Sequence, residues 1–430
     1  MLQSSVIPST HADLITDTAY DYHGLKLATA GIDQKIKIWK LNELSGVWSM
    51  IDEWKAHDAP VAKIAWAHPE FGTLIASCSY DRTVKIWEDA RSAPDGAGSS
   101  RFQLRTTLTE ARGTVRAVDF APAAFGLKLV TIASDNFVRI YECHETYHLT
   151  AWSLAEEFDA AAISLPLSAG ESPNSGATPT QTHATLSDTP PLAPSGISLQ
   201  RTGTAPSALI ASTSGNPLTK PVGVKEADGA WCVSWLKDRF TVPGEIIAVS
   251  CGTQAIVKII ALQPSKPPQA LLVIPQHPAN TQSSLLGTAT PTSTSPSLLP
   301  AVPHAAPSHP VHAITCLAWA PPCGRSYHLL ATGSRDHKVR IFKLWQGERD
   351  GFGDEDAGKG DLAWSFSRLG EFDDHKASVG RVEWNITGTI LSSAGDDGKI
   401  RLWKATFNNV WRSMGTLGAV ESEGGDAMEQ

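Results

Sequence analysis

One repeated pattern limits what this chain can fold into more than any other feature of its sequence. Five segments each contain an apolar run, then an Asp, then an aromatic residue six positions after the Asp. A sixth segment, IAVSCGTQAIVKII (247–260), has Thr253 near the Asp position and no aromatic residue. The five full copies are LATAGIDQKIKIW (Asp33, Trp39), IASCSYDRTVKIW (Asp81, Trp87), VTIASDNFVRIY (Asp135, Tyr141), LATGSRDHKVRIF (Asp336, Phe342) and LSSAGDDGKIRLW (Asp397, Trp403).

A second aromatic residue precedes each of the six turns by 13 to 18 positions: Tyr20, Trp66, Phe120, Trp235, Trp319 and Trp384. Runs such as V-K-I-W alternate with period 2 and are rich in β-branched and aromatic residues, which is typical of half-buried strands. An Asp before such a run favours a tight turn, because its carboxylate accepts neighbouring backbone N–H groups. A single unit of about four strands cannot cover both faces of its sheet, whereas units stacked in a ring can. The repeats therefore predict an all-β fold, a six-bladed β-propeller of the WD40 type.

Two proline-rich segments interrupt the repeats. Segments 166–227 and 275–310 together hold 17 of the 28 prolines and none of the aromatic residues. They cannot bury enough apolar area to offset the entropy of ordering the chain, so we expect disordered inserts. Their five Ser/Thr-Pro dipeptides suggest phosphorylation, although such a composition also produces these pairs by chance. We further expect an acidic loop at 347–361, an acidic tail at 416–430, and a single propeller domain over 1–415.

The formal net charge of −8 comes entirely from the acidic loop and the tail, because each of them contributes −4. The remaining chain is neutral, and this argues against direct nucleic-acid binding, which normally requires a basic excess. The six cysteines form no C-x-x-C pair, and no stretch has the length of an apolar membrane span. The N-terminus lacks the pattern of a signal peptide. We expect no enzymatic activity, no cofactor and no metal site.

His, Ser and Asp recur together in the repeats, and these are also the ingredients of a nucleophilic triad. Their repetition argues against catalysis, since an enzyme needs one active site rather than several equivalent ones. In WD40 repeats such residues form a hydrogen-bonded tether that holds the outer turn of the blade. Spacing does not decide whether Ser77 or Ser79 takes part in the second unit. The predicted tether residues are His57, Asp81, Trp87, His375, Asp397, Trp403, Asp33, Trp39, Asp135 and Asp336.

Several phrases resemble the small WD-repeat nucleoporin family of the Y-shaped nuclear pore scaffold, over residues 11 to about 415. They include LKLATAGIDQKIKIWKL, WKAHDAPVAKIAWAHPEFGTLIASCSYDRTVKIWE, FAPAAFGLKLVTIASDNFVRIYE, GRSYHLLATGSRD and VEWNITGTILSSAGDDGKIRLWKATFNNVW. The A-H-P-E-F-G and S-Y-D-R-T-V-K-I-W motifs are shared with the sister family, the propeller subunit of the COPII outer coat. The degenerate fourth repeat, G-R-S-Y-H-L-L-A-T and N-I-T-G-T favour the nucleoporin. The two long inserts and the acidic loop depart from the family pattern.

The resemblance implies an open ring of six blades, completed when an α-solenoid nucleoporin inserts its own strands as a seventh blade. It implies a location at the nuclear pore in the nuclear envelope, with roles in nucleocytoplasmic transport and mRNA export. It also implies membership of the SEA/GATOR assembly at the vacuolar or lysosomal membrane, which signals to TOR, with only indirect membrane association. The alternatives are a COPII coat subunit in transport from the endoplasmic reticulum, or a WD40 adaptor that reads a peptide.

An open ring leaves the flanks of the first and last blades without a neighbour, so a groove for the inserted blade is expected between them. The alternative is that Val6 and Ile7 fray and that Trp411 packs inside its own blade. The residues predicted to line this groove are Leu2, Val6, Ile7, Leu14, Leu402, Trp411 and Met414.

Overall fold

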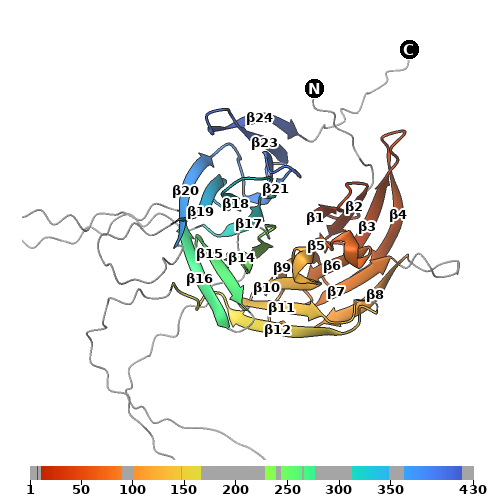
Figure 1. Ribbon diagram of the computed structural model, residues 1–430. Coiled ribbons are helices and arrows are strands. Elements are labelled where there is room, and N and C mark those ends of the chain that lie inside the picture. The colour runs from red at the N-terminus through yellow and green to blue at the C-terminus, as the bar shows by residue number, and fades with distance from the viewer. Residues whose placement is uncertain are drawn as a thin grey trace, which may run out of the picture. The chain divides into compact units, whose positions relative to one another are not determined.

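The described residues of the computed structural model form twenty-four strands and two short 3-10 helices (Figure 1). The structure describes residues 7, 11–89, 101–146, 148–165, 228–238, 244–263, 266–276, 312–347 and 363–418. The strands form six antiparallel four-stranded sheets, and each sheet is built from four strands that are consecutive in the chain. These sheets are the six predicted blades, numbered here 1 to 6 in chain order, and the predicted all-β propeller is confirmed.

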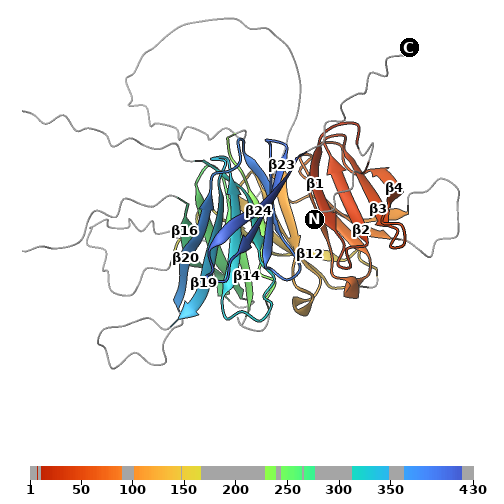
Figure 2. The same cartoon turned by 90° about the horizontal axis from the view of Figure 1, so that it is seen from above.

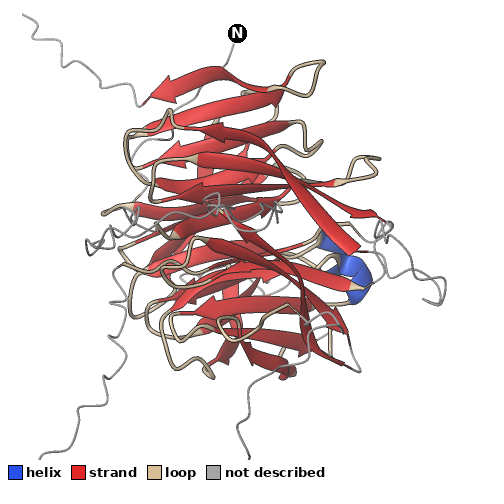
Figure 3. Ribbon diagram, turned by 90° about the vertical axis from the view of Figure 1, so that its left-hand side faces the viewer, coloured by secondary structure: helices blue, strands red, loops and turns tan. Residues whose placement is uncertain are grey.

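Blades 1 to 3 consist of β1 (Ile15–Tyr20), β2 (Lys26–Gly31), β3 (Lys35–Leu41) and β4 (Trp48–Lys55); β5 (Val61–Trp66), β6 (Leu74–Ser79), β7 (Val84–Asp89) and β8 (Phe102–Leu108); and β9 (Val115–Phe120), β10 (Lys128–Ala133), β11 (Phe137–Cys143) and β12 (Trp152–Asp159). Blades 4 to 6 consist of β13 (Cys232–Trp235), β14 (Glu245–Ser250), β15 (Ile256–Gln263) and β16 (Lys266–Pro275); β17 (Ile314–Trp319), β18 (His328–Ser334), β19 (Val339–Gly347) and β20 (Ala363–Phe372); and β21 (Val379–Trp384), β22 (Ile390–Gly395), β23 (Lys399–Ala405) and β24 (Trp411–Gly418). The 3-10 helices, Pro69–Phe71 and Ala123–Phe125, follow the first strands of blades 2 and 3 and lie near one edge of the molecule in Figure 3.

Both sequence landmarks occupy fixed positions in the blades. Each of the six upstream aromatic residues is the last residue of the first strand of its blade. The five Asp residues lie in the turns between second and third strands, and the residue after each Asp adopts a left-handed backbone. At four of these turns that residue is not glycine, as with Arg82 at φ 69°, while Gly398 adopts φ 68° without the cost of a side chain. The Asp carboxylate accepts the backbone N–H of the second residue after it, and this hydrogen bond stabilises the conformation.

The predicted inserts, acidic loop and tail lie largely outside the described residues. At their edges the strands extend slightly further than predicted. Pro275 ends β16 and Gly347 ends β19, while β24 continues to Gly418, three residues past the predicted end of the propeller at 415. Each of these residues pairs in register with the neighbouring third or fourth strand.

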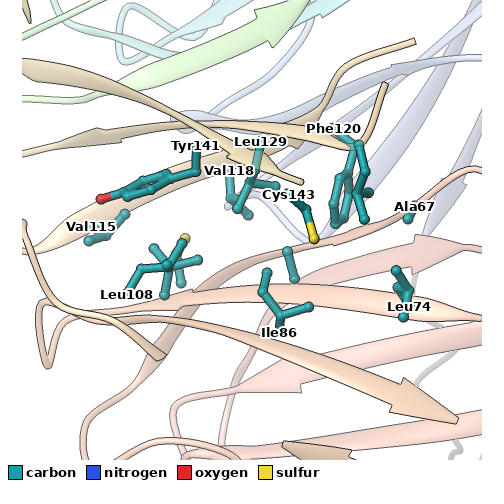
Figure 4. Packing of buried hydrophobic residues seen from close by; sticks show 14 of the residues in the cluster. Ala67, Leu74, Ile86, Leu108, Val115, Val118, Phe120, Leu129, Tyr141 and Cys143 are labelled. Carbon is teal, nitrogen blue, oxygen red and sulfur yellow. The ribbon is translucent and has the colours of Figure 1, made fainter. Parts of the chain in front are cut away.

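The apolar core is divided into five clusters, and each cluster joins the facing sides of two consecutive blades. Between blades 2 and 3, for example, Leu74 and Ile86 pack against Phe120, Leu129 and Tyr141 (Figure 4). Corresponding clusters join blades 1 and 2, 3 and 4, 4 and 5, and 5 and 6. Among the described residues, no such cluster joins blade 6 to blade 1. In Figure 1 the outer strands β4 and β24 stand on opposite sides of this junction, which we call the open junction.

The first strand of each blade lies nearest the axis of the ring. At five of the six junctions the first strands of neighbouring blades pack side by side, in the order β1, β5, β9, β13, β17 and β21. The view from above in Figure 2 shows blades 1 and 6 as the two ends of this series. The ring is therefore closed by packing at five junctions and open at the sixth.

Candidate partner-binding site at the open junction

The tether predicted in blade 2 is present as a chain of hydrogen bonds. His57 Nδ1 lies 2.9 Å from Asp81 Oδ2, and His57 Nε2 lies 2.8 Å from Ser77 Oγ. Trp87 Nε1 donates to the same hydroxyl at 2.9 Å. Ser79 does not belong to this chain, since its hydroxyl donates to the carbonyls of Ala59 and Pro60. The structure therefore resolves the choice between the two serines in favour of Ser77.

Blades 6 and 1 repeat this geometry. In blade 6 His375 contacts Asp397 at 3.1 Å and Ser393 at 2.8 Å, and Trp403 donates to Ser393 at 2.9 Å. In blade 1 the same chain consists of His11, Asp33, Thr29 and Trp39. His11 was not among the predicted residues, although it precedes its Asp by 22 positions, the same spacing as in blade 6. The three copies connect the turn of each blade to its second and third strands.

Blade 3 has no His at the tether spacing, and in blades 3 and 5 an arginine from the third strand binds the turn Asp. Arg139 binds Asp135 at 2.8 Å, and Arg340 binds Asp336 at 2.5 Å. Both arginine side chains are only 1 % exposed. Sequence reasoning missed them, although each lies four residues after its Asp, a position at which blades 1, 2 and 6 also carry Lys or Arg.

These partners shift the titration of the turn carboxylates. Burial opposes ionisation of Asp81, but hydrogen bonds from His57 and Thr83 outweigh it, so the pKa of Asp81 lies well below its ordinary value. Burial likewise opposes ionisation of Asp397, and hydrogen bonds from His375, the Lys376 backbone and Arg401 lower its pKa on balance. The geometry holds each carboxylate in its charged form. We propose that these chains are structural tethers, since the same arrangement recurs in three blades.

The open junction exposes apolar side chains that are buried elsewhere in the ring. Ile400 of β23 is 43 % exposed, whereas the residues at the same position of the other five third strands are at most 2 % exposed: Ile36, Val84, Val138, Val257 and Val339. Two residues further along β23, Leu402 is half-buried, while its five counterparts are buried. Blade 6 packs on blade 5 through the opposite face of its sheet, which carries Leu391 and Trp403. The face of the blade 6 sheet that carries Ile400 therefore borders the open junction.

Blade 1 presents a matching exposed aromatic residue. Tyr20 is 54 % exposed, whereas the corresponding Trp66 and Trp384 reach back to the preceding blade. Trp66 Nε1 donates to the carbonyl of Ala19 in blade 1 at 2.8 Å, and Trp384 Nε1 donates to that of Ala318 in blade 5 at 3.0 Å. The blade that would precede blade 1 is absent at the open junction, so the Tyr20 ring remains exposed to solvent.

The residues predicted to line the groove are only partly brought together. Leu14 and Met414 are exposed at the terminal blades, and Ile7 is half-buried. Leu2 and Val6 lie outside the described residues. Trp411 is buried instead, with its ring 5.4 Å from that of Trp384 in an edge-to-face contact within the core between blades 5 and 6. The assignment of Trp411 to the groove was wrong, because register places it on the packed face of blade 6, opposite Ala405.

Exposed large apolar side chains concentrate in the two terminal blades. Of the sixteen such residues in the described part of the chain, seven lie in blade 1 and five in blade 6. Within the same described ranges, blades 4 and 5 contribute none. Isolated exposed apolar residues are normal on protein surfaces, but a concentration beside an unfilled junction is typical of an interaction site.

The central channel has a volume of about 1150 Å³ and is lined by the first strands of all six blades. Its charged side chains are balanced between the two signs. The basic residues are Lys63, Arg116, Lys237 and Arg381, and the acidic residues are Asp17, Glu70, Asp119 and Glu383. Several of them neutralise one another, as in the 2.9 Å contact between Lys237 and Asp119. This lining lacks the arginine cluster that would favour the peptide-reading alternative.

The described residues contain no group of three or more His, Cys, Asp or Glu side chains placed to hold a metal ion. Within those same residues, no helix has the length and apolar character needed to cross a membrane.

Comparison with known proteins agrees with the repeats. The WD domain, G-beta repeat family matches residues 3–40, 48–88, 306–343 and 366–404. Nucleoporin SEH1 of Saccharomyces cerevisiae is 31 % identical, over 96 % of this chain and 98 % of that protein. Nucleoporin SEH1 of Homo sapiens is 31 % identical and that of Danio rerio 32 % identical, each over 97 % of this chain and 89 % or 88 % of the relative. With the six-bladed fold, this similarity over nearly the whole length shows that the chain belongs to the SEH1 family of WD-repeat nucleoporins.

Proposed function

We propose that this chain is a scaffold subunit of the nuclear pore, and that it binds an α-solenoid nucleoporin which inserts a seventh blade at the open junction. One observation carries the proposal: five apolar clusters serve six junctions among the described residues. The junction without a cluster is flanked by the two blades that expose the most large apolar side chains.

An inserted blade would supply what the other junctions already have. One of its faces would cover Ile400 and Leu402, and the other would pack against Tyr20. Removing these apolar surfaces from water favours association at roughly 25 cal/mol per Å². Strands of the inserted sheet would need no ladder with this chain, because β1–β4 and β21–β24 already form complete four-stranded sheets. Face-to-face packing between blades would therefore provide most of the binding free energy.

The finer parts of the proposal rest on the family resemblance. We place the chain at the nuclear envelope, in the outer ring of the pore, where it supports nucleocytoplasmic transport and mRNA export. We include a second assembly, SEA/GATOR, at the periphery of the vacuolar or lysosomal membrane, with signalling to TOR. In both settings other subunits of the assembly would provide the membrane contact.

The test is affinity capture of the tagged full-length protein from extract of its own cells, followed by identification of stoichiometric partners. We expect a nucleoporin with an α-solenoid domain, and a higher melting temperature of the complex than of the chain alone. Ile400→Glu should lose this partner. Leu104→Glu is the matched control, because Leu104 is similarly exposed at 46 % but lies on blade 2, away from the junction.

Two results would overturn the proposal. Capture of COPII coat subunits in place of nucleoporins would support the trafficking alternative. Equal recovery of the nucleoporin with Ile400→Glu and with the wild-type chain would place the partner elsewhere on the propeller.

A further inference from the structure

Asp17 and Arg381 occupy equivalent positions on the first strands of the first and last blades. Each is the residue that follows the register shift near the start of its strand, after Ile15 in β1 and after Val379 in β21. Asp17 pairs with Ala30, and Arg381 pairs with Ala394, which itself lies at the position of Ala30. The two side chains therefore stand at the same height on the two strands that border the open junction.

They form an ion pair across this junction. Arg381 Nη1 contacts Asp17 Oδ1, and Arg381 Nη2 also lies 3.2 Å from Glu383. The second oxygen of Asp17 accepts the backbone N–H of Ile64 in blade 2 at 2.9 Å. The Asp17 side chain is only 6 % exposed, and that of Arg381 is 29 % exposed. The pair thus connects blade 6 through Asp17 to blade 2, at the inner edge of the ring.

We propose that the Asp17–Arg381 ion pair is a latch that holds the two ends of the open ring together in the partner-free chain. The five other junctions are held by apolar clusters, and the described residues supply none at this one. The pair holds the inner edge, while Ile400 and Tyr20 remain exposed further along the same junction. The chain therefore keeps a junction that is joined at the axis and unfilled outside it.

The latch has a consequence for partner binding, and this part rests on the proposed function. A first strand inserted between β1 and β21 would have to separate Asp17 from Arg381. Their separation is costly for Asp17, because its buried carboxylate would be left without its charged partner. The entering strand would therefore compete with the ion pair, and the latch would disfavour association with chains that offer no polar replacement.

The latch can be tested on the isolated full-length protein by double electron–electron resonance. Nitroxide labels are attached at Leu44→Cys and Phe407→Cys, in a Cys323→Ser background that removes the exposed native thiol. Leu44 and Phe407 lie in the β3–β4 and β23–β24 turns, and both are fully exposed. The measured distance therefore spans the open junction. We expect a single narrow distribution for the parent protein, and a broader, longer one after Arg381→Gln or Asp17→Asn.

Three matched controls separate a latch from general loosening. Arg381→Lys keeps the charge and should retain the narrow distribution, and Glu383→Gln removes the other acidic neighbour and should leave it unchanged. Labels at Leu104→Cys and Leu154→Cys span the closed junction of blades 2 and 3 and should report no change in any variant. An unchanged distribution in Arg381→Gln, or equal broadening across the closed junction, would overturn the latch. Because no partner is present, this failure would leave the proposed function untouched.

Discussion

Ile36 and Ile400 are the same residue type at the same position of the third strand, in the first and last blades, yet their surroundings are opposite. Ile36 is fully buried against blade 2, while Ile400 is 43 % exposed at the open junction. Local sequence does not distinguish the two sites, since KIKIW and KIRLW are nearly the same strand. The difference arises only from the blade that each face meets.

This pair gives a matched prediction for stability. Ile36→Ala removes buried methyl and methylene groups and leaves a cavity, so we expect a loss of about 2–5 kcal/mol in the free energy of unfolding. Ile400→Ala should cost about 1 kcal/mol or less, because its side chain is already partly in water. Chemical denaturation of the two variants gives both values. Equal losses would mean that the open junction is filled within the isolated chain.

The arginines that bind the turn carboxylates predict unequal losses of stability when they are replaced in blades 3 and 6. Arg139 and Arg401 lie at the same position, but Asp397 also has His375 at 3.1 Å, whereas Asp135 has no such histidine. Arg139→Met should leave Asp135 with backbone donors alone and cost about 3–5 kcal/mol. Arg401→Met should cost clearly less. Urea denaturation compares the variants, and the reverse order would contradict the equivalence of His and Arg in these turns.

The lowered pKa values of the turn carboxylates predict acid sensitivity. A carboxylate whose pKa is lower in the folded state contributes stability above its unfolded pKa, and that contribution is lost as the pH falls toward the folded pKa. Asp33, Asp81, Asp135, Asp336 and Asp397 all have lowered values. The free energy of unfolding should therefore decline as the pH falls below about 5.

Asp81→Asn isolates one of these contributions. The variant should be less stable than the wild-type protein near neutral pH, and its free energy of unfolding should fall less steeply between pH 5 and pH 2. Urea denaturation over this pH range measures both slopes. Parallel slopes for the two proteins would show that Asp81 does not contribute to the acid sensitivity.

The contacts of Lys258 predict a local effect on hydrogen exchange in the segment that follows the last strand of blade 3. Its ammonium group donates to the carbonyls of Ala160, Ala161 and Ile163 at 2.7, 2.9 and 2.7 Å. Lys258→Met should therefore speed amide hydrogen exchange in 159–165, while exchange in β5–β8 stays as in the wild-type protein. Lys266→Met, an exposed lysine of the same blade, is the control. Unchanged protection in 159–165 would show that these contacts do not order the segment.

Thiol reactivity follows from burial. Burial raises the pKa of Cys78 to about 12 and those of Cys251 and Cys316 to about 11, so their reactive thiolate forms are scarce at pH 8. Cys323 is exposed. A colorimetric disulfide reagent should therefore modify one thiol rapidly in the folded protein, and Cys323→Ser should abolish this fast phase. A fast phase that persists in the variant would show that a buried thiol is accessible.

The blades and their turns could be predicted from the sequence because both are local. Alternation with period 2 identifies a strand, also in the degenerate fourth blade, and an Asp six residues before an aromatic residue identifies the turn in the other five blades. The sequence could not decide whether Ser77 or Ser79 belongs to the tether of blade 2. Both side chains point to the same face of β6, and only depth along the strand decides which one meets His57.

The open junction could be predicted less well. The exposure of Ile400 depends on the absence of a neighbouring sheet, and the sequence around Ile400 does not indicate that absence. The burial of Trp411 depends on the register of β24 against β23, since a shift of one residue would move it to the other face. The contact between Asp17 and Arg381 joins residues 364 positions apart and follows from ring geometry alone.

The assembly of each blade from four consecutive strands has a mechanical consequence. Among the described residues no strand of the first blade completes the sheet of the last, so tension across these two blades meets no shared hydrogen-bonded ladder. Apart from the Asp17–Arg381 pair, blades 1 and 6 each pack against one neighbour and can detach singly, whereas blades 2 to 5 pack against neighbours on both sides. Under load, the first resistance would come from the contacts made at the sixth junction. A partner bound there would therefore act as the keystone of the ring.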